Sequence, residues 1–349
     1  MLDRGGKYAG VMEPLAAEIP NGLAPTRRFS RFSQFAWGVL VYNLAVILWG
    51  ALVRATSSGA GCGGHWPLCN GDALPQFAQA ATVIEFTHRV MSGLALLSTV
   101  ALYVWARRDF VLQHPARHSA LHPARHSGAH PARRWAGWAL VFMLTEALLG
   151  ASLVLLGHVA KDESTGRIFS LSLHLVNTFL LLASLTLTAR WAAVSDAPPL
   201  GKRAGWAASA APLAALVIVA IAGAITALGD TLFPAHTLAE GVRDDFAAAG
   251  NFLVRLRIIH PVLAIAAAGF LWWVALPEFQ ARRSQALQRL SGAVLLLAAG
   301  EVLAGAANIL LKAPLAMQLV HLLIADCLWI ALVLFMAERA AAAPRAVSG

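Results

Sequence analysis

Long apolar segments alternate with short polar or basic ones along most of the chain. An α-helix needs about 20 apolar residues to cross the hydrocarbon core of a bilayer, and eight segments reach roughly that length. They lie at roughly 35–53, 82–106, 135–157, 168–190, 206–228, 254–275, 289–311 and 315–337. This pattern predicts an all-α polytopic membrane protein with eight transmembrane helices.

Composition narrows the class of protein. Of the 349 residues, 58% are hydrophobic and only 13% are charged, and the mean hydropathy is +0.64. An average soluble domain has about 25% charged residues, so a soluble enzyme, a disordered chain and a small disulfide-stapled secreted module are all excluded. The net charge of +9 resides in loops between the apolar segments rather than along one helix face. We therefore expect the lipid bilayer, and no nucleic acid, as a partner.

Lysine and arginine fall unevenly on the two sides of the predicted bundle. The side of the N-terminus carries Arg27, Arg28, Arg31, Arg107, Arg108, Arg117, Arg125, Arg133, Arg134, Arg190, Lys202, Arg203, Arg282, Arg283 and Arg289. The loops of the other side carry Arg54, Lys161, Arg167, Arg243 and Lys312. Basic loops stay inside, and no apolar signal-peptide core precedes the first segment. We expect both tails, 1–34 and 338–349, to be cytoplasmic, in a bacterial-type cytoplasmic (inner) membrane.

The inner loop at 107–134 is basic and repeats its own sequence. The run His114-Pro-Ala-Arg-His118-Ser is followed eight residues later by His122-Pro-Ala-Arg-His126-Ser. A histidine-rich tract can bind metal. A solvated, positively charged loop is the interpretation that we favour, because short repeats of this kind arise by slippage and need no ligand.

A second repeat involves the membrane segments themselves. Residues 146–150 read Glu-Ala-Leu-Leu-Gly and residues 301–305 read Glu-Val-Leu-Ala-Gly, and each run precedes a segment with an early histidine. Four crossings return the chain to the side on which it started. The sequence therefore predicts two pseudo-repeated four-helix bundles in parallel orientation, at 35–190 and 206–337.

Four histidines lie inside predicted membrane segments, namely the second, fourth, sixth and eighth: His88, His174, His260 and His321. Each falls about six residues into its segment, roughly 9 Å from the outer surface. A single such histidine is commonly a packed polar group bonded to a backbone carbonyl, but four at matched depth favour a function. Neutral imidazoles on facing helices suit axial ligation of haem iron. The chain has no Cys-x-x-Cys-His motif, so we expect the haem to be bound non-covalently.

Glu85 and Arg89 lie on either side of His88. Glu85 precedes His88 by three residues, shares its helix face, and could accept or relay a proton beside a haem ligand. The spacing equally allows a plain ion pair between Glu85 and Arg89, and Arg89 could instead bind a haem propionate. The second half has Arg257 in the position of Glu85, so the carboxylate occurs in one half only.

A loop rich in Gly and Pro, on the predicted outer side, contains Cys62 and Cys69. Two cysteines seven residues apart on the oxidising side are expected to form a disulfide. The bond could be a loop staple, which we favour, or a redox-active pair that exchanges with a partner thiol. Cys327, in the last segment, is expected only to pack.

These residues resemble the haem A synthase family (CtaA/COX15 type) over roughly residues 35–337. The resemblance rests on Gly50-Ala-Leu-Val-Arg54-Ala-Thr56-Ser-Ser58-Gly59-Ala-Gly61-Cys62, on Trp66-Pro67-Leu-Cys69 and on Glu85-x-x-His88-Arg89. It implies an oxidoreductase that converts the C8 methyl group of haem O into a formyl group by successive oxidations, giving haem A for terminal oxidases.

For this chain, the resemblance implies that His88 and His174 bind the substrate haem O in the first half. His260 and His321 would hold a haem b cofactor in the second half, and Glu85 becomes the catalytic candidate. Haem O synthase is the implied source of the substrate. The electron acceptor and any homo-oligomeric state remain open.

The chain departs from the family pattern in two places. The outer loop 229–254 lacks the further cysteine pair that some relatives have, and Pro261 stands where an arginine often follows the histidine. A competing interpretation is a di-haem b-type membrane protein that only transfers electrons, although a carrier has no evident use for Glu85 beside His88 in one half alone. A transporter built on the same repeat would require a broken helix near mid-membrane, and the segments show none clearly.

Overall fold

The computed structural model describes residues 31–77, 79–112, 130–194, 206–247 and 252–342. Within these ranges, eight helices are long and apolar enough to cross a membrane. They are α1 (Arg31–Ala55), α2 (Ala80–Leu112), α3 (Pro131–Leu155), α4 (Thr165–Ala192), α5 (Trp206–Leu232), α8 (Ile259–Ala281), α9 (Gln285–Leu310) and α10 (Leu315–Ala342). The predicted all-α fold with eight transmembrane helices is confirmed.

Most of these helices extend about a turn beyond the apolar segments that predict them. Helical hydrogen bonding continues into polar residues past the apolar segments, where serine side chains cap the starts of α4 and α9. The hydroxyl of Ser164 accepts from the backbone N–H of Arg167 at 3.2 Å, and that of Ser284 accepts from Leu287 at 3.1 Å. Hydropathy finds the apolar part of each helix but not these capped ends.

Four short elements complete the described structure. Two are α-helical, α6 (Leu238–Asp245) and α7 (Phe252–Arg255), and two are 3-10 turns, η1 (Ser58–Ala60) and η2 (Leu256–Ile258). The piece α7–η2 leads directly into α8, so the sixth membrane span runs over Phe252–Ala281. Helix α6 is too short and polar for hydropathy to detect, and it begins with a capping box between Thr237 and Glu240.

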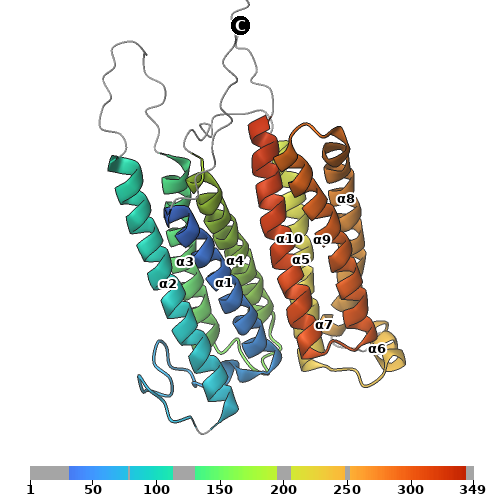
Figure 1. Ribbon diagram of the computed structural model, residues 1–349. Coiled ribbons are helices and arrows are strands. Elements are labelled where there is room, and N and C mark those ends of the chain that lie inside the picture. Colours follow the sequence, from blue (N-terminus) through green and yellow to red (C-terminus); the bar gives the residue numbers. More distant parts are fainter. Residues whose placement is uncertain (1–30, 78, 113–129, 195–205, 248–251, 343–349) are drawn as a thin grey trace, which may run out of the picture.

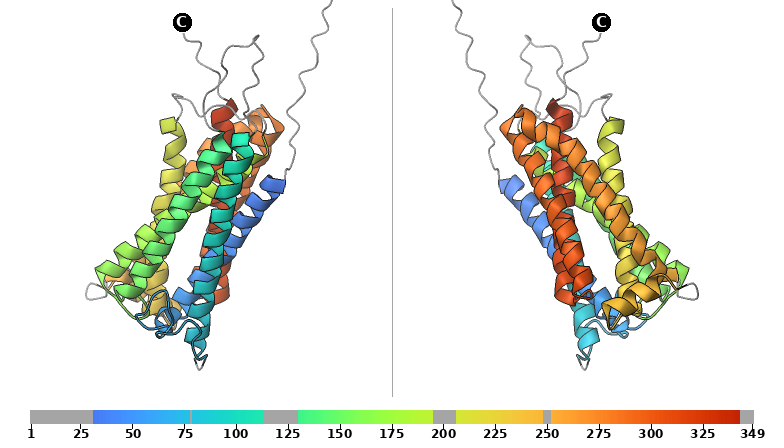
Figure 2. Two further views of the ribbon diagram at one scale, coloured as in Figure 1. Left: turned by 90° about the vertical axis from the view of Figure 1, so that its left-hand side faces the viewer. Right: turned by 90° about the vertical axis from the view of Figure 1, so that its right-hand side faces the viewer.

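The helices form two neighbouring groups of four (Figure 1). Helices α1–α4 make the first group, and α5 with α8–α10 makes the second. The side views show helices that run from one end of the molecule to the other and are tilted against one another, with the connections gathered at the two ends (Figure 2). The end that holds the loop 56–77 and α6 is called the disulfide end below. That the two groups are a structural repeat remains a prediction.

The two groups meet where α1 and α4 of the first pack against α5 and α10 of the second. The rings of Phe179 on α4 and Trp329 on α10 stack with centroids 4.6 Å apart, and the indole N–H of Trp329 donates to the carbonyl of Phe179 at 2.9 Å. Both residues are buried. A buried indole needs such an acceptor, and the pair therefore fixes how deeply α10 lies against α4.

Large apolar side chains cover the outside of the molecule. Trp273, Leu296 and Leu303 are 73%, 73% and 71% exposed. An apolar surface of this kind is unfavourable in water and suits the hydrocarbon of a bilayer. The chain is therefore described as a multi-pass membrane protein. The histidines of the repeated 114–126 tract lie outside the described residues, as do residues 1–30 and 343–349 of the two predicted tails.

Candidate functional site

The four intramembrane histidines lie toward one end of the molecule. His88 is on α2, His174 on α4, His260 on α8 and His321 on α10, each within the first three turns of its helix counted from the disulfide end. Each group of four helices therefore contains two histidines. The prediction of one histidine in each even-numbered span, all near the same side, agrees with this placement.

Each imidazole ring packs against a glycine of the preceding membrane helix. A Cβ atom added at Gly50 or Gly223 would lie 3.0 or 2.8 Å from Cε1 of the facing histidine, closer than two such carbons normally approach. Only a residue without a side chain leaves room for the ring there. The full set of pairs is Gly50–His88, Gly150–His174, Gly223–His260 and Gly305–His321.

His260 and His321 face each other across the second group, with ring centroids 6.3 Å apart. Bonds between a metal and an imidazole nitrogen are about 2 Å long, so two imidazoles on opposite sides of one iron have centroids roughly 6 Å apart. Nδ1 of His260 lies 3.2 Å from the carbonyl oxygen of Val219, and Nδ1 of His321 contacts Oε2 of Glu301. When Nδ1 donates, Nε2 is the nitrogen left for a metal. These residues fit axial ligation of a haem.

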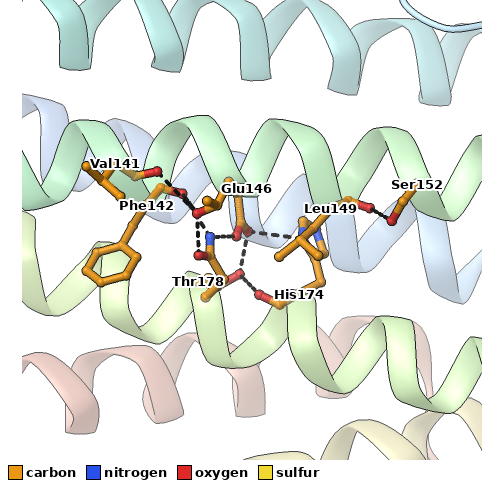
Figure 3. A network of polar contacts seen from close by, with 9 residues as sticks. Val141, Phe142, Glu146, Leu149, Ser152, His174 and Thr178 are labelled. Carbon is orange, nitrogen blue, oxygen red and sulfur yellow. Dashed lines mark hydrogen bonds and ion pairs between the residues drawn. The ribbon is translucent and has the colours of Figure 1, made fainter.

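His88 and His174 form the corresponding pair in the first group. Nδ1 of His88 is buried and has no hydrogen-bond partner among the described residues. Nδ1 of His174 lies 3.5 Å from Oε1 of Glu146, a carboxylate that also accepts from Asn177 and Thr178 (Figure 3). An unpartnered buried nitrogen is rare in a finished core. In a neutral imidazole such a nitrogen is available to donate to a further group or to bind a metal.

Glu85 is fixed by its neighbours. The residue is 3% exposed, its Oε2 accepts from the backbone N–H of Cys62 at 2.8 Å, and its Oε1 accepts from Nη2 of Arg89 at 2.5 Å. The ion pair that the sequence spacing allowed is therefore present. The carboxylate lies one turn from His88 on α2, and its role in proton transfer stays a prediction.

Arg89 also binds the loop that contains the two cysteines. Its Nη1 donates to the carbonyl oxygens of His65 at 2.6 Å and Leu68 at 2.5 Å. Arg89 thus fastens this loop to α2, a contact that the sequence did not reveal. Binding of a haem propionate by Arg89 stays a prediction, and it would have to coexist with these bonds.

The predicted disulfide between Cys62 and Cys69 is present in the structure. Both cysteines are buried, and the backbone N–H of Asn70 donates to the carbonyl of Cys62 at 2.9 Å. Gly61 packs so closely on the start of α2 that an added Cβ would lie 2.4 Å from the carbonyl group of Ala81. The loop is therefore a compact cap over the disulfide end of α2. Cys327 is a free thiol on α10.

The second group has a different arrangement where the first has Glu85. Arg257, three residues before His260, donates to the carbonyls of Gly229 at 2.7 Å and Phe233 at 2.6 Å, and pairs with Asp230 at 2.9 Å. Asp245 of α6 lies 3.9 Å from the same guanidinium. Burial raises the pKa of Asp245, and the positive charge of Arg257 opposes that shift. Arg257, in η2 just before α8, thus connects this segment to the end of α5 and to α6 at the disulfide end.

Sequence reasoning used Glu146 and Glu301 only as markers of a repeat, and it missed their contacts. Each carboxylate lies beside Nδ1 of a histidine on the following membrane helix. The sequence contained a signal for these contacts. Each Glu stands four residues, or about one helical turn, before a glycine, and that glycine faces the histidine. The spacing places each carboxylate one turn from that glycine on the same helix, and the packing of the two helices then decides whether it reaches the ring.

A family model for cytochrome oxidase assembly proteins (COX15-CtaA) matches residues 33–333. The chain belongs to this family. The match covers all eight membrane helices except the ends of the first and last, and it confirms the family resemblance inferred from the sequence motifs.

Individual relatives match parts of the chain. A "Protoheme IX farnesyltransferase" of Thermus thermophilus is 44% identical over 318 residues, which is 90% of this chain and 49% of that protein. A "Heme A synthase" of Lysinibacillus sphaericus is 31% identical over 185 residues, 53% of this chain and 54% of the relative. Another of Geobacillus kaustophilus is 32% identical over 151 residues, 43% and 42% of the two chains. The chain thus spans about half the length of these curated relatives.

Proposed function

We propose that this protein is a haem A synthase, an oxidoreductase that converts the C8 methyl group of haem O into a formyl group and so supplies haem A to terminal oxidases. The observation that carries the proposal is the buried carboxylate of Glu85, one turn from His88, where the other histidine pair has Arg257 instead. Relatives named Heme A synthase support this assignment.

The two histidine pairs have different proposed roles. His88 and His174 bind the substrate haem O between α2 and α4. His260 and His321 bind a haem b cofactor between α8 and α10, which supplies one-electron transfer when it is bound. The 6.3 Å separation of the second pair of rings supports a resident haem at that site.

Oxidation of a methyl group to a formyl group with water as the oxygen source releases four protons and four electrons. The electrons would leave one at a time through the haem b cofactor to an external one-electron acceptor, and the substrate site needs a proton acceptor. Glu85 is the proposed acceptor because it shares a helix face with His88. The hydrogen bonds from Cys62 and Arg89 hold its carboxylate in one position relative to α2. A base held in position is more effective than a mobile one.

Haem O synthase is the proposed source of the substrate. The relative from Thermus thermophilus is about twice the length of this chain and is named for adding a farnesyl group to protohaem. A farnesylated protohaem is the substrate that the proposal requires. The proposed setting is the cytoplasmic membrane of a bacterium, with both termini inside.

The test is to express the full chain together with a haem O source, extract the haems and identify them by mass. Wild-type protein is expected to give haem A. Glu85→Gln should lower haem A formation by about 10²-fold or more, as expected for a lost general base. The haem content should stay unchanged because the carboxylate is not a ligand. Glu338→Gln is a matched control, since it removes a carboxylate paired with Arg190 at the opposite end.

Three other results of this test would each contradict a different part of the proposal. Full haem A production by Glu85→Gln would remove the catalytic role of Glu85. A wild-type protein that retains b-type haem at both sites and makes no haem A would be the di-haem electron carrier. Conversion of haem B into haem O would instead indicate farnesyl transfer, the activity in the name of the Thermus relative.

A further inference from the structure

Two carboxylates that the proposed reaction does not use lie against histidines. Glu146 on α3 lies beside His174 on α4, and Glu301 on α9 lies beside His321 on α10. Both carboxylates are largely buried, with 18% and 14% of their side chains exposed. Each therefore faces the Nδ1 atom of a candidate haem ligand in surroundings where water competes little for the contact.

The two contacts differ in closeness. In the first group, Oε1 of Glu146 is 3.5 Å from Nδ1 of His174, beyond ordinary hydrogen-bond length. In the second group, Oε2 of Glu301 contacts Nδ1 of His321 directly. The same pair of residue types, placed at the same sequence spacing from the facing glycine, therefore makes a longer contact in the first group and a closer contact in the second.

Two polar residues on α4 account for the longer contact. Asn177 Nδ2 donates to Oε2 of Glu146 at 2.5 Å, and Thr178 Oγ1 donates to Oε1 at 2.5 Å (Figure 3). Asn177 and Thr178 follow His174 by three and four residues, so they lie on its side of the helix. Their hydrogen bonds hold the carboxylate so that its nearer oxygen is 3.5 Å from Nδ1 of His174.

The second group has apolar residues at the equivalent positions. Three and four residues after His321, α10 has Ile324 and Ala325, whose side chains carry no hydrogen-bond donor. Nothing at these positions draws Glu301 away from His321. The surroundings of the two carboxylates thus differ in these two pairs of residues, and also in Asp326, a buried carboxylate on α10 that interacts with Glu301.

A ligating histidine that donates its second ring N–H to a carboxylate becomes a more basic ligand. For haem iron, such hydrogen bonds change both the hold on the metal and its reduction potential. We propose that Glu301 and Glu146 are positioning residues that set how firmly each site retains haem, through His321 strongly and through His174 weakly. The inference rests on the proposed function, in which one haem stays as a cofactor and the other enters as substrate and leaves as product.

The first experiment removes the closer contact, between Glu301 and His321. In a His174→Ala background, which retains the axial pair of the second group only, Glu301→Gln is compared with its parent after loading with haem b. Haem transfer to excess apomyoglobin should speed up about 10–100-fold, the usual effect of losing such a partner. The midpoint potential should rise by about 60 mV for each tenfold change in relative affinity of the two iron states.

Glu278→Gln is the matched control. Glu278 is also a buried glutamate on a membrane helix, but it pairs with Arg339 at the far end of the molecule. Its loss should leave both the transfer rate and the potential unchanged. A purely structural effect of removing a buried carboxylate would shift the two variants alike.

The second experiment exchanges the two neighbouring pairs. In a His321→Ala background, Asn177→Ile with Thr178→Ala should release Glu146 toward His174, slow haem transfer and lower the potential. In the His174→Ala background, Ile324→Asn with Ala325→Thr should do the opposite to the second site. These changes add no charge, so they separate the carboxylate contact from a general electrostatic effect.

Folded variants with unchanged transfer rates and potentials would overturn the inference, as would a protein that binds no haem at all. These measurements need only bound haem b and no haem O. If the protein fails to produce haem A, the transfer rates and potentials can still be measured. That failure would count against the proposed function alone.

Discussion

At the scale of single residues, the glycines that face the histidines decide how closely two helices and a ring can pack. Gly223 on α5 and Gly150 on α3 occupy the same kind of position, because each faces the ring of a histidine on the following membrane helix. The room available to a side chain nevertheless differs, because an added Cβ would be 2.8 Å from the ring at Gly223 and 3.9 Å at Gly150. The two positions therefore provide a test with a built-in control.

We expect Gly223→Ala to displace the ring of His260 and to lower haem occupancy of the second site by about tenfold or more. Gly150→Ala places a methyl group at an ordinary contact distance and should keep full occupancy, with stability raised by up to about 1 kcal/mol through helix propensity. The haem-to-protein ratio of the purified variants measures the first effect, and thermal unfolding measures the second. Equal occupancy in both variants would contradict this account of the glycines.

The sequence predicts which residues matter at this scale better than it predicts their contacts. Four histidines in alternate spans stand out because an ionisable group in a membrane is rare. The contact of Glu301 with His321 depends on how α9 and α10 rotate against each other, which no spacing within one helix determines. Arg89 illustrates the same limit, since its bonds to the carbonyls of His65 and Leu68 depend on a loop conformation.

At the scale of elements, the loop 56–77 is fastened to α2 by several bonds. The disulfide closes it, Arg89 holds its carbonyls, and the N–H of Cys62 reaches Glu85. The sequence predicted the disulfide from the two cysteines on one side of the membrane. It did not predict the fastening to α2, because backbone carbonyls carry no sequence signature.

We expect Cys62 and Cys69 to resist alkylation in protein isolated without reductant, and to react after reduction. Replacing both with Ala should lower the free energy of unfolding by about 2 kcal/mol, the order expected for a disulfide that closes a short loop. If the bond is only a staple, turnover per folded molecule should be retained. Mass analysis of alkylated peptides and unfolding in detergent are the two measurements. Alkylation of both thiols before reduction would contradict the prediction.

At the scale of the whole molecule, Arg54 connects the two groups near the disulfide end. It lies at the end of α1 and donates to the carbonyl of Ala227 at 2.7 Å and to the hydroxyl of Thr231 at 3.1 Å, both on α5. It also donates to Oε1 of Gln318 on α10 at 3.1 Å. The count of basic residues on the two sides identified Arg54 only as one of a few on the outer side. The sequence of one segment does not predict which residues of the other group a side chain will contact.

We expect Arg54→Ala to lower the free energy of unfolding by about 2–3 kcal/mol, because it leaves partly buried acceptors without their charged donor. Arg54→Lys should fall between wild type and Ala, since an ammonium cannot reproduce the fork of contacts. Arg243→Ala is the control, because its exposed pair with Asp244 should cost less than about 1 kcal/mol. Unfolding midpoints in one detergent give the comparison. Equal losses for Arg54→Ala and Arg243→Ala would show that Arg54 does not join the groups.

All four histidines lie within three turns of one end, so the candidate haem sites are closer to one membrane surface than to the other. Ten helical residues span about 15 Å, roughly half of a 30 Å hydrocarbon layer. In a sealed vesicle, a membrane-impermeant oxidant or reductant would have to cross less of the bilayer from the compartment that faces the disulfide end than from the other. Reactions at these sites would then be faster with a reagent added on the side of the disulfide end. The orientation in which the protein is inserted decides which compartment that is.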